Sequence, residues 1–352
     1  MSIRMQKLSP PFEALVRTAL SKRGFDIGHV GPGPRETFSA LSNAVMELSD
    51  FYLKHPGDPT PWGQDSAFSA YIAYFMPLNF VRLRDAFREV KRFLRPDAVS
   101  EIWDFGAGLG TTQWVLESEQ WLAPRPLYTL EVSREAESEH ENLLRIFPAA
   151  RWSPQRALHK PRPPPGALAV FSYSFLEMPS YWNELERFDH LLIVEPSTRD
   201  CGRQLMWWRQ RWIQMGFEPL APCTHAFACP LLTHSARDWC HDRVKFEAPL
   251  WWLELEEHLP MKNRTLTYSY LLLSRTSADS RWRGQTRVIG DTLNEKGKTR
   301  QLICRGSKRE FLSWLHRQGE PPQIPHGALI SNLEGEMKGQ EVRVVNEIKF
   351  TI

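Results

Sequence analysis

Two groups of residues in this sequence could do chemistry. One is a glycine-rich turn, Asp104-Phe105-Gly106-Ala107-Gly108-Leu109-Gly110, and the other is a set of four of the chain's five cysteines, Cys223, Cys229, Cys240 and Cys304. Glycines let a backbone approach a nucleotide-like cofactor where side chains would collide with it. Thiolates are soft ligands that suit zinc or iron–sulfur clusters. Together they indicate a cofactor-binding fold that also carries a metal centre.

The glycine turn has the features of a cofactor site. A strand that ends in Asp104 runs into the glycines, and Glu131 ends the next strand, where such folds hold ribose hydroxyls. S-adenosylmethionine has no pyrophosphate, so Asp104 is tolerable beneath its amino-acid moiety, whereas Asp104 would repel a dinucleotide. A plain strand-to-helix turn is the alternative. The residues predicted to bind S-adenosylmethionine are Asp104, Gly106, Ala107, Gly108, Gly110, Glu131 and Ser174.

The spacing of the cysteines is irregular. Five residues separate Cys223 from Cys229, ten separate Cys229 from Cys240, and close Cys-x-x-Cys pairs of the kind that zinc modules use are absent. An iron–sulfur cluster accepts scattered ligands more readily, and Cys304 would join it from another domain. Three histidines keep zinc open as the alternative, and buried apolar cysteines remain a third interpretation. These histidines are His225, His234 and His241.

A nucleophilic cysteine is a further alternative. Pro222-Cys223 or Cys229-Pro230 could supply the thiolate of a cytosine C5 methyltransferase. Such nucleophiles follow the fourth or fifth strand directly, whereas both pairs here follow a further helix. Cys201 does follow the fifth strand but has no adjacent proline, so we interpret it as an ordinary cysteine.

The elements that position these groups read as an α/β protein. Residues before about Leu94 are mostly helical by pattern, and apolar strands then alternate with helices as in a parallel sheet. After Arg275 short strands and turn signals predict a small β-rich unit. We therefore expect a class I methyltransferase-like, Rossmann-like sheet. The predicted division is an N-terminal helical region at 1–95, a methyltransferase-like domain at 96–276 with a cysteine-rich insertion at 221–245, and a C-terminal domain at 277–352 that contributes Cys304.

Composition limits the function classes. With 42% hydrophobic and 24% charged residues the chain is ordinary for a globular protein, and no apolar run approaches the roughly 20 residues that span a bilayer. No signal-like segment is evident, so reduced cysteines and no membrane are expected. The net charge is only +3, but from Asp279 onward 13 Lys and Arg face 9 Asp and Glu. With Trp282, Trp314 and His316 this region could contact RNA.

The chain resembles the methyltransferase-like proteins of the small ribosomal subunit, a family known from mitochondria and bacteria. By that resemblance, Cys223, Cys229, Cys240 and Cys304 would coordinate a four-iron four-sulfur cluster. The protein would bind the small subunit on its rRNA as an assembly factor. In place of the family's Pro-Cys-Pro-His run, this chain has Thr224 after the cysteine. The matching segments are Ser69-Ala70-Tyr71-Ile72-Ala73-Tyr74-Phe75-Met76-Pro77, Asp104-Phe105-Gly106-Ala107-Gly108, Ser172-Tyr173-Ser174-Phe175-Leu176-Glu177, Val194-Glu195-Pro196, Ala221-Pro222-Cys223-Thr224-His225, Cys229-Pro230 and Trp239-Cys240-His241.

Catalysis is left open by the sequence. No Asn or Asp followed by Pro-Pro and an aromatic is present, and Glu177 is as well explained by helix capping as by proton transfer. The alternative to an assembly factor is an active rRNA methyltransferase, directed at a base nitrogen or at cytosine C5, with a structural zinc site. We expect a monomer off the ribosome, in a bacterial cytoplasm or, in a eukaryote, the mitochondrial matrix. We also expect the cysteine site to join two regions that otherwise have little to bind them.

Overall fold

One open sheet forms the centre of the molecule. The computed structural model describes residues 4–28, 35–55, 57–157, 162–276, 283–344 and 346–352. In these residues the sheet has nine strands in the order β1-β8-β9-β6-β5-β2-β3-β4, with β7 also paired to β9. Its strands are β1 (Met5–Gln6), β2 (Ile102–Phe105), β3 (Leu127–Leu130), β4 (Pro154–Arg156), β5 (Leu168–Ser172), β6 (His190–Glu195), β7 (Glu218–Ala221), β8 (Asp242–Phe246) and β9 (Thr265–Ser274).

The strand directions identify the fold. Strands β4, β3, β2, β5 and β6 run parallel, and β9 lies antiparallel between β6 and β7. This order, in which the connections reverse direction between β2 and β5, is that of class I S-adenosylmethionine-dependent methyltransferases. The predicted fold class is confirmed. The short pairing of β1 with β8 was not foreseen.

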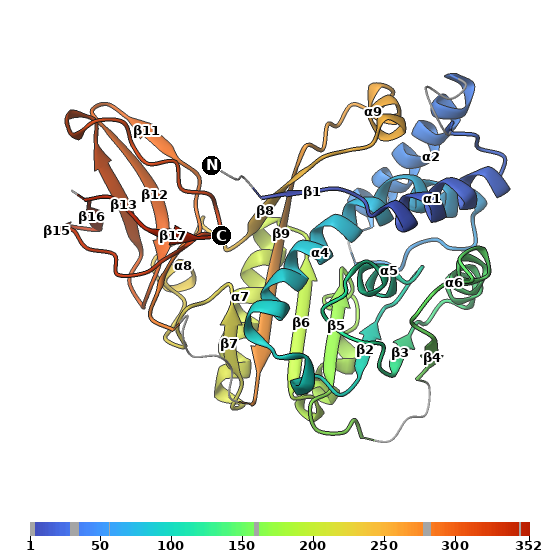
Figure 1. Cartoon of the computed structure of the whole chain (residues 1–352), viewed down its shortest axis with the longest axis horizontal. Helices are drawn as coiled ribbons and strands as arrows, with labels where there is room; N and C mark the ends of the chain where they lie inside the picture. The colour runs from blue at the N-terminus through green and yellow to red at the C-terminus, as the bar shows by residue number, and fades with distance from the viewer. Residues whose placement is uncertain (1–3, 29–34, 56, 158–161, 277–282, 345) are drawn as a thin grey trace.

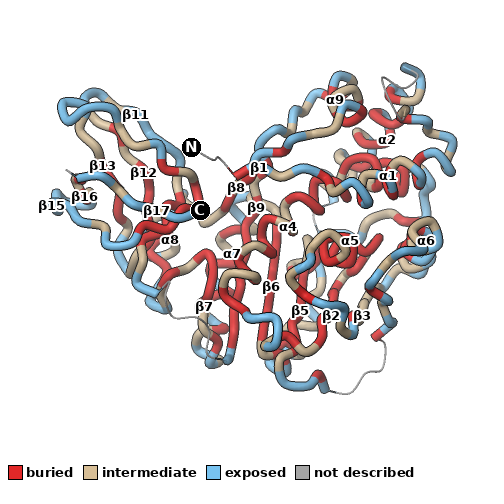
Figure 2. The backbone as a smooth tube through the Cα atoms, in the orientation of Figure 1, coloured by how far each residue is buried: buried red, intermediate tan, exposed pale blue. Residues whose placement is uncertain are grey.

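Helices cover both faces of the sheet. Alternate residues of β6 serve the two sides: Leu192 and Val194 face the cluster that contains α4, and Leu191 and Ile193 face the cluster that contains α7. Figure 1 accordingly shows α4 in front of the sheet and α7 behind it, and Figure 2 shows the central strands buried along their length. The helices are α1 (Pro10–Lys22), α2 (Arg35–Lys54), α3 (Asp65–Ala70), α4 (Met76–Phe93), α5 (Thr111–Ser118), α6 (Arg134–Ile146), α7 (Arg199–Gln214), α8 (Pro230–Thr233) and α9 (Leu250–Glu257).

The helical pattern before Leu94 holds one irregularity. Between α3 and α4 the chain makes a single π-helical turn, Tyr71–Phe75, with no break in the helical course. Such turns are rare and are frequent at functional sites. Of the described helices, none is both long and apolar enough to cross a membrane.

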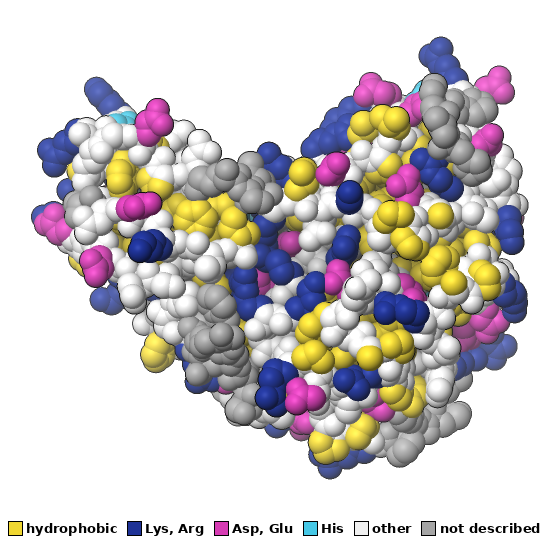
Figure 3. All heavy atoms as spheres, in the orientation of Figure 1, with side chains coloured by type: hydrophobic (Ala, Val, Ile, Leu, Met, Phe, Trp, Pro, Cys, Tyr) yellow, Lys and Arg dark blue, Asp and Glu magenta, His cyan; other side chains and the backbone are white. Residues whose placement is uncertain are grey.

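The C-terminal residues form a second, smaller sheet. In the described part it has eight strands around a core that includes Val288, Ile303, Leu312 and Val342. Figure 1 shows this unit beside the main sheet, across from the N-terminal helices, and Figure 3 shows a hollow between the two. Its strands are β10 (Thr286–Val288), β11 (Leu293–Glu295), β12 (Lys298–Cys304), β13 (Glu310–Leu315), β14 (Leu329–Ile330), β15 (Glu336–Lys338), β16 (Glu341–Arg343) and β17 (Phe350–Thr351).

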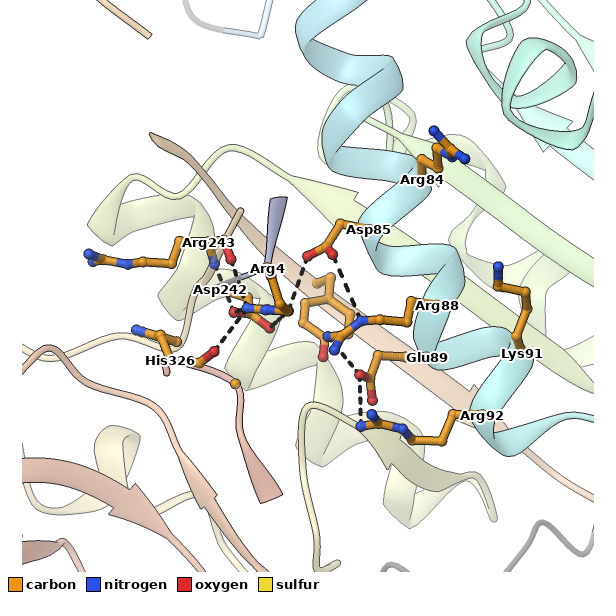
Figure 4. A network of polar contacts seen from close by, with 12 residues as sticks. Arg4, Arg84, Asp85, Arg88, Glu89, Lys91, Arg92, Asp242, Arg243 and His326 are labelled. Atoms are coloured by element: carbon orange, nitrogen blue, oxygen red, sulfur yellow. Dashed lines mark hydrogen bonds and ion pairs between the residues drawn. The ribbon is translucent and has the colours of Figure 1, made fainter. Parts of the chain in front are cut away.

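A buried network of charges ties this unit to the main sheet (Figure 4). The guanidinium of Arg4 donates to Asp85 of α4 at 3.0 Å, to Asp242 of β8 and to the backbone carbonyl of His326 at 3.1 Å. Arg4, Asp85 and Asp242 are each less than 10% exposed. The N-terminal segment, α4, β8 and the C-terminal unit therefore meet at one side chain.

A second junction is made by Arg287 of β10. It donates to the carboxylate of Glu89 on α4 at 2.9 Å, and both side chains are 1% exposed. Arg88 and Arg92 lie at 2.9 and 3.2 Å from the same carboxylate. The expectation that little besides the cysteine site binds the C-terminal unit to the rest is therefore wrong, because ion pairs between distant segments leave no local sequence pattern.

Candidate functional site

The glycine turn is tied to the neighbouring strand by its backbone. The N–H groups of Gly106 and Ala107 both donate to the carbonyl of Leu130, at 2.7 and 3.2 Å. Gly106, Gly108 and Gly110 have φ values of 68°, 50° and 78°, a region that other residues seldom adopt. The sequence therefore forms this turn because all three positions require glycine.

The three glycines do different things. A Cβ at Gly106 would collide with Ser174, and a Cβ at Gly110 would collide with the imidazole of His140 on α6. Among the described residues, and apart from its chain neighbours, a Cβ at Gly108 would have only Trp62 within 4 Å, at 3.8 Å. Gly106 and Gly110 thus permit close packing of the protein on itself, and Gly108 is the position with space in front of it. The hydroxyl of Ser174, 5% exposed, donates to the carbonyl of Phe105.

Glu131 is held at both carboxylate oxygens. One oxygen accepts the N–H of Gly108 at 2.7 Å, and the other accepts the N–H of Ser133 at 2.9 Å. Ser133 also begins α6, where its side chain accepts the N–H of Ala136 at 3.2 Å. Each carboxylate oxygen can accept a second hydrogen bond, so a diol could bind Glu131 without breaking this arrangement.

Two buried carboxyl groups lie near the carboxyl ends of β2 and β6. Asp104 is 1% exposed and accepts the hydroxyl of Thr112 at 2.7 Å. Burial raises the pKa of Asp104 to about 7, against the effect of that hydrogen bond. Burial likewise raises the pKa of Glu195, 3% exposed, to about 8. Both groups would gain from a nearby cation, which favours the ionised carboxylate.

The N-terminal helices cover the turn, which sequence reasoning missed. Trp62 stacks on Phe68 with ring centroids 5.2 Å apart and meets Tyr71 edge-on at 5.0 Å. Burial raises the pKa of Tyr71 to about 12, and the charges of Glu131 and Glu177 act in the same direction, so this phenol lies close to the predicted cofactor residues. The π-helical turn begins at Tyr71. Its irregularity could not be seen in a periodic apolar pattern.

The four predicted cysteine ligands line one cavity. Cys223 follows β7, Cys229 precedes α8, Cys240 precedes β8, and Cys304 ends β12. Leu205 and Met206 of α7 complete one wall. The four cysteines therefore lie next to the ends of three strands and one helix. Their positions span 82 residues of sequence, from 223 to 304.

Two basic side chains point at the sulfur atoms. The Nε of Arg209 donates to Cys223 Sγ at 2.9 Å, and this guanidinium, 2% exposed, also donates to the carbonyls of His225 and Phe227. The Nε2 of His225 lies 3.2 Å from Cys304 Sγ. Arg209 was not anticipated, although a charge within the aromatic run of α7 was a visible signal.

Burial raises the pKa of Cys229, Cys240 and Cys304 above that of a free thiol, and the charge of neighbouring thiolates acts in the same direction. Such thiols stay protonated until a cation joins them. Among the described residues, no three His, Cys, Asp or Glu side chains are grouped so that they could hold a metal ion. Proximity of four thiols is what the structure shows.

The remaining sequence candidates lie elsewhere. Cys201 is in the first turn of α7 and is not among the residues that line the cavity. His234 is exposed, and His241 packs against the ring of His326 with centroids 5.2 Å apart. Glu177 is exposed. The short helix that follows, Pro179–Arg187, has Met178 at its N-cap and no side-chain cap, so the interpretation of Glu177 as a helix cap is wrong. Trp282 lies outside the described residues.

A known sequence family covers most of this chain. Residues 65–312 match the sequence family described as mitochondrial small ribosomal subunit Rsm22. The chain belongs to the Rsm22 family. The matched span contains both the glycine turn and all four cavity cysteines, which confirms the resemblance drawn from the sequence. No curated protein sequence matches the chain.

The solved structures that are similar to this Rsm22-family chain include methyltransferases, at low sequence identity. A candidate RNA methyltransferase from Pyrococcus horikoshii has 14% identity and a TM-score of 0.34, covering 67% of this chain and all of its own. TYW2 of M. jannaschii, solved with AdoMet, has 12% identity and a TM-score of 0.33, covering 56% and 77%. A Geobacter sulfurreducens methyltransferase, solved with S-adenosyl-L-homocysteine, has 13% identity and a TM-score of 0.31, covering 56% and 90%.

Proposed function

We propose that this methyltransferase-like protein binds S-adenosylmethionine and an iron–sulfur cluster, contacts the rRNA of the small ribosomal subunit, and assists the assembly or translation of that subunit. The observation that carries the proposal is the convergence of Cys223, Cys229, Cys240 and Cys304 on one cavity in a chain of the Rsm22 family. The family's description supplies the ribosomal partner. We propose a monomer off the ribosome, located wherever its host assembles such subunits.

The donor set supports a cluster. Four thiolates around an iron–sulfur core carry net negative charge. Arg209 donates an N–H to Cys223 Sγ, and the Nε2 of His225 lies 3.2 Å from Cys304 Sγ, where the Nε2–H tautomer would donate. Hydrogen bonds to cluster sulfurs and partial burial are the means by which proteins stabilise such centres. A cluster here would supply a rigid crosslink between the segment after β7, the start of α8, the segment before β8 and the end of β12.

The glycine turn supports a methyl donor. The carboxylate of Glu131 could accept hydrogen bonds from the hydroxyls of a ribose. Gly108 has space in front of it, and Asp104 lies in the same turn. S-adenosylmethionine carries a sulfonium and an ammonium cation, which suits a pocket with several carboxyl groups. Trp62 and Tyr71 supply aromatic faces against which an adenosine could pack.

Anaerobic purification tests the metal assignment. We expect a brown protein with about four iron atoms per chain, as a cubane cluster requires. The Cys201→Ser variant is the matched control, because Cys201 is a cysteine of the same chain outside the cavity. A colourless protein with stoichiometric zinc would select the zinc alternative.

Binding to ribosomal particles tests the function. Wild type is expected to sediment with small subunits and not with large ones. The Gly108→Arg variant fills the space before the turn, where Trp62 lies 3.8 Å from the position of a Cβ. If sedimentation survives in this variant and no methyl mark on small-subunit rRNA depends on Gly108, the protein acts without methyl transfer.

An active rRNA methyltransferase is the second candidate. The contact between Glu131 and the N–H of Gly108 is compatible with it, because methyl transfer also requires the bound donor. In that case Gly108→Arg abolishes a specific rRNA methylation while subunit binding persists. A mark on a base nitrogen or on cytosine C5 would then define the reaction.

A further inference from the structure

The outer face of α7 carries a regular row of arginine and tryptophan. Arg199, Arg203, Trp207 and Arg211 follow one another at every fourth position, so they lie along one face of the helix. We call these four residues the α7 stripe. The opposite face, with Leu205, is buried against the sheet and the cysteine cavity.

Trp207 is exposed to an unusual degree. Its side chain is 51% exposed, and its ring meets the buried Trp208 edge-on, with centroids 5.1 Å apart and planes at 88°. Trp208 is fixed in turn by Trp182, at 4.5 Å. The contact supports Trp207 at one edge and leaves ring surface open to solvent. Apolar burial does not account for a tryptophan in this position.

Two arginines of the stripe have defined contacts, one with the Trp207 ring and one with the backbone. The guanidinium of Arg211 lies 5.9 Å from the centroid of Trp207. One nitrogen of Arg203 donates to the backbone carbonyls of Ser235 and Asp238, at 2.9 and 3.0 Å. Arg203 therefore approaches the surface in a fixed position.

A shallow hollow opens beside Trp207. Two arginines, one glutamine amide and one carboxylate surround it, so its net charge is positive even though Asp200 pairs with Arg199 at 3.3 Å. It is lined by Arg199, Asp200, Arg203, Gln204, Trp207 and Ala236. An open aromatic face beside guanidinium groups matches the chemistry of an unpaired nucleotide, whose base stacks and whose phosphate pairs with arginine.

We propose that the α7 stripe binds a single-stranded segment of RNA, with one base stacked on Trp207 and flanking phosphates on Arg199 and Arg211. The inference rests on the proposed function, in which the partner is rRNA, and names the surface and the form of RNA. Duplex RNA fits less well, because its bases are stacked inside the helix and cannot reach a lone tryptophan.

The stripe lies on the helix that also serves the cysteine cavity. Arg209, which donates to Cys223 Sγ, and Met206, which lines the cavity, are on α7 two or fewer positions from Trp207. RNA bound at the stripe would therefore be separated from the cavity by the thickness of one helix.

The test uses the full chain and a fluorescein-labelled, unstructured oligonucleotide of uridine and adenosine, followed by anisotropy. Trp207→Ala is expected to weaken binding about tenfold, as the loss of one stacked base does. Trp207→Phe keeps a ring and is expected to stay within about threefold of wild type. Arg211→Ala should lower the slope of log affinity against log salt by about 0.7.

Matched controls are available on other helices. Leu250→Ala removes an exposed hydrophobic side chain, 72% exposed, and Arg145→Ala removes an arginine whose side chain is 69% exposed. Neither should change affinity or salt slope. Thermal melting of all variants should match wild type, because the substituted side chains are at the surface.

The outcomes separate the stripe from the proposed function. Weakening in Trp207→Ala with rescue by phenylalanine supports the stripe. Wild-type affinity in Trp207→Ala and Arg211→Ala, equal loss in alanine and phenylalanine variants, or no oligonucleotide binding by wild type overturns it. Sedimentation with small subunits is measured in parallel: if only sedimentation fails in wild type, the proposed function falls and the stripe stands.

Discussion

The glycine turn and the cysteine cavity are built in opposite ways. The turn and its carboxylate lie between Asp104 and Ser133, on two consecutive strands and the helices that follow them. The cavity collects side chains from 223 to 304, through two sheets. A contiguous motif keeps its geometry wherever the local backbone forms, whereas a converging site exists only when the whole fold is in place.

Their electrostatic surroundings also differ. Near the turn, buried carboxyl groups such as Asp104 and Glu195 have raised pKa values. In the cavity, Arg209 directs an N–H donor at Cys223 Sγ, and the Nε2 of His225 lies 3.2 Å from Cys304 Sγ. The first environment favours a bound cation and the second favours bound thiolate charge, as a sulfonium donor and a thiolate-ligated metal would respectively require.

The largest expected effect comes from removing a cavity cysteine. Cys240→Ser should abolish the visible absorbance of the anaerobic protein and lower its melting temperature, because a bound centre contributes its binding free energy to folding. Absorbance spectra, iron content and thermal melting measure this. Cys201→Ser should leave all three unchanged. Retained colour and melting in Cys240→Ser would remove Cys240 from the ligand set.

The next effect tests the buried ion pairs that join the C-terminal unit to α4. Glu89→Gln leaves Arg287, Arg88 and Arg92 buried without their carboxylate, at an expected cost of about 3–5 kcal/mol in unfolding free energy. Denaturant titration measures it. Asp97→Asn, in an exposed pair with Arg95, is the control and should cost less than about 1 kcal/mol.

The same substitution has a pH signature. Burial opposes ionisation of Glu89, but the charges of Arg287, Arg88 and Arg92 outweigh it and lower the pKa of Glu89 from 4.5 to about 2. The carboxylate therefore contributes fully above its unfolded pKa, and that contribution is lost as pH falls toward 2. Wild type should lose its advantage over Glu89→Gln in that window. A difference that is independent of pH would contradict the ion-pair explanation.

The contrast between the two regions explains what could be predicted from sequence. Periodicity and the glycine turn were sufficient to predict the sheet, and the cysteines were sufficient to predict that four thiols come together, since thiols are few and chemically distinctive. Arg4, Glu89 and Arg287 gave no signal, because a charged residue on a helix or strand is ordinarily solvated. The position of Trp62 and Tyr71 over the glycine turn was not predicted either. An aromatic residue that covers a pocket has the same sequence pattern as one that fills a core.

A smaller effect is expected from the buried acid of the turn. The folded protein retains the proton of Asp104 up to a pKa of about 7, whereas the model-compound value is 3.8. Folding stability attributable to this group therefore falls as pH rises between those values. Asp104→Asn should melt as wild type does near pH 4 and a few degrees higher near pH 8.

Donor binding provides the second readout for Asp104. Because a cation favours the ionised carboxylate, calorimetric affinity of wild type for S-adenosylmethionine should rise from about pH 6 to about pH 8, and that of Asp104→Asn should be weaker and flat. The colour of the cysteine site should not change in this variant. An identical pH profile in both proteins would place the titrating group elsewhere.

The smallest effects compare the helix starts that serve the two regions. Ser133 caps α6 beside Glu131, and Thr198 caps α7, whose Gly202 lines the cavity. Replacing either by alanine should cost about 1 kcal/mol in unfolding free energy. Only Ser133→Ala should also weaken S-adenosylmethionine binding. The backbone N–H of Ser133 that holds Glu131 is retained, but loss of the side-chain cap to Ala136 leaves that backbone less firmly held. Chemical unfolding and calorimetry measure the two quantities. Equal losses of donor affinity in both variants would mean that the start of α6 does not position Glu131, and that the turn depends on the wider fold as the cavity does.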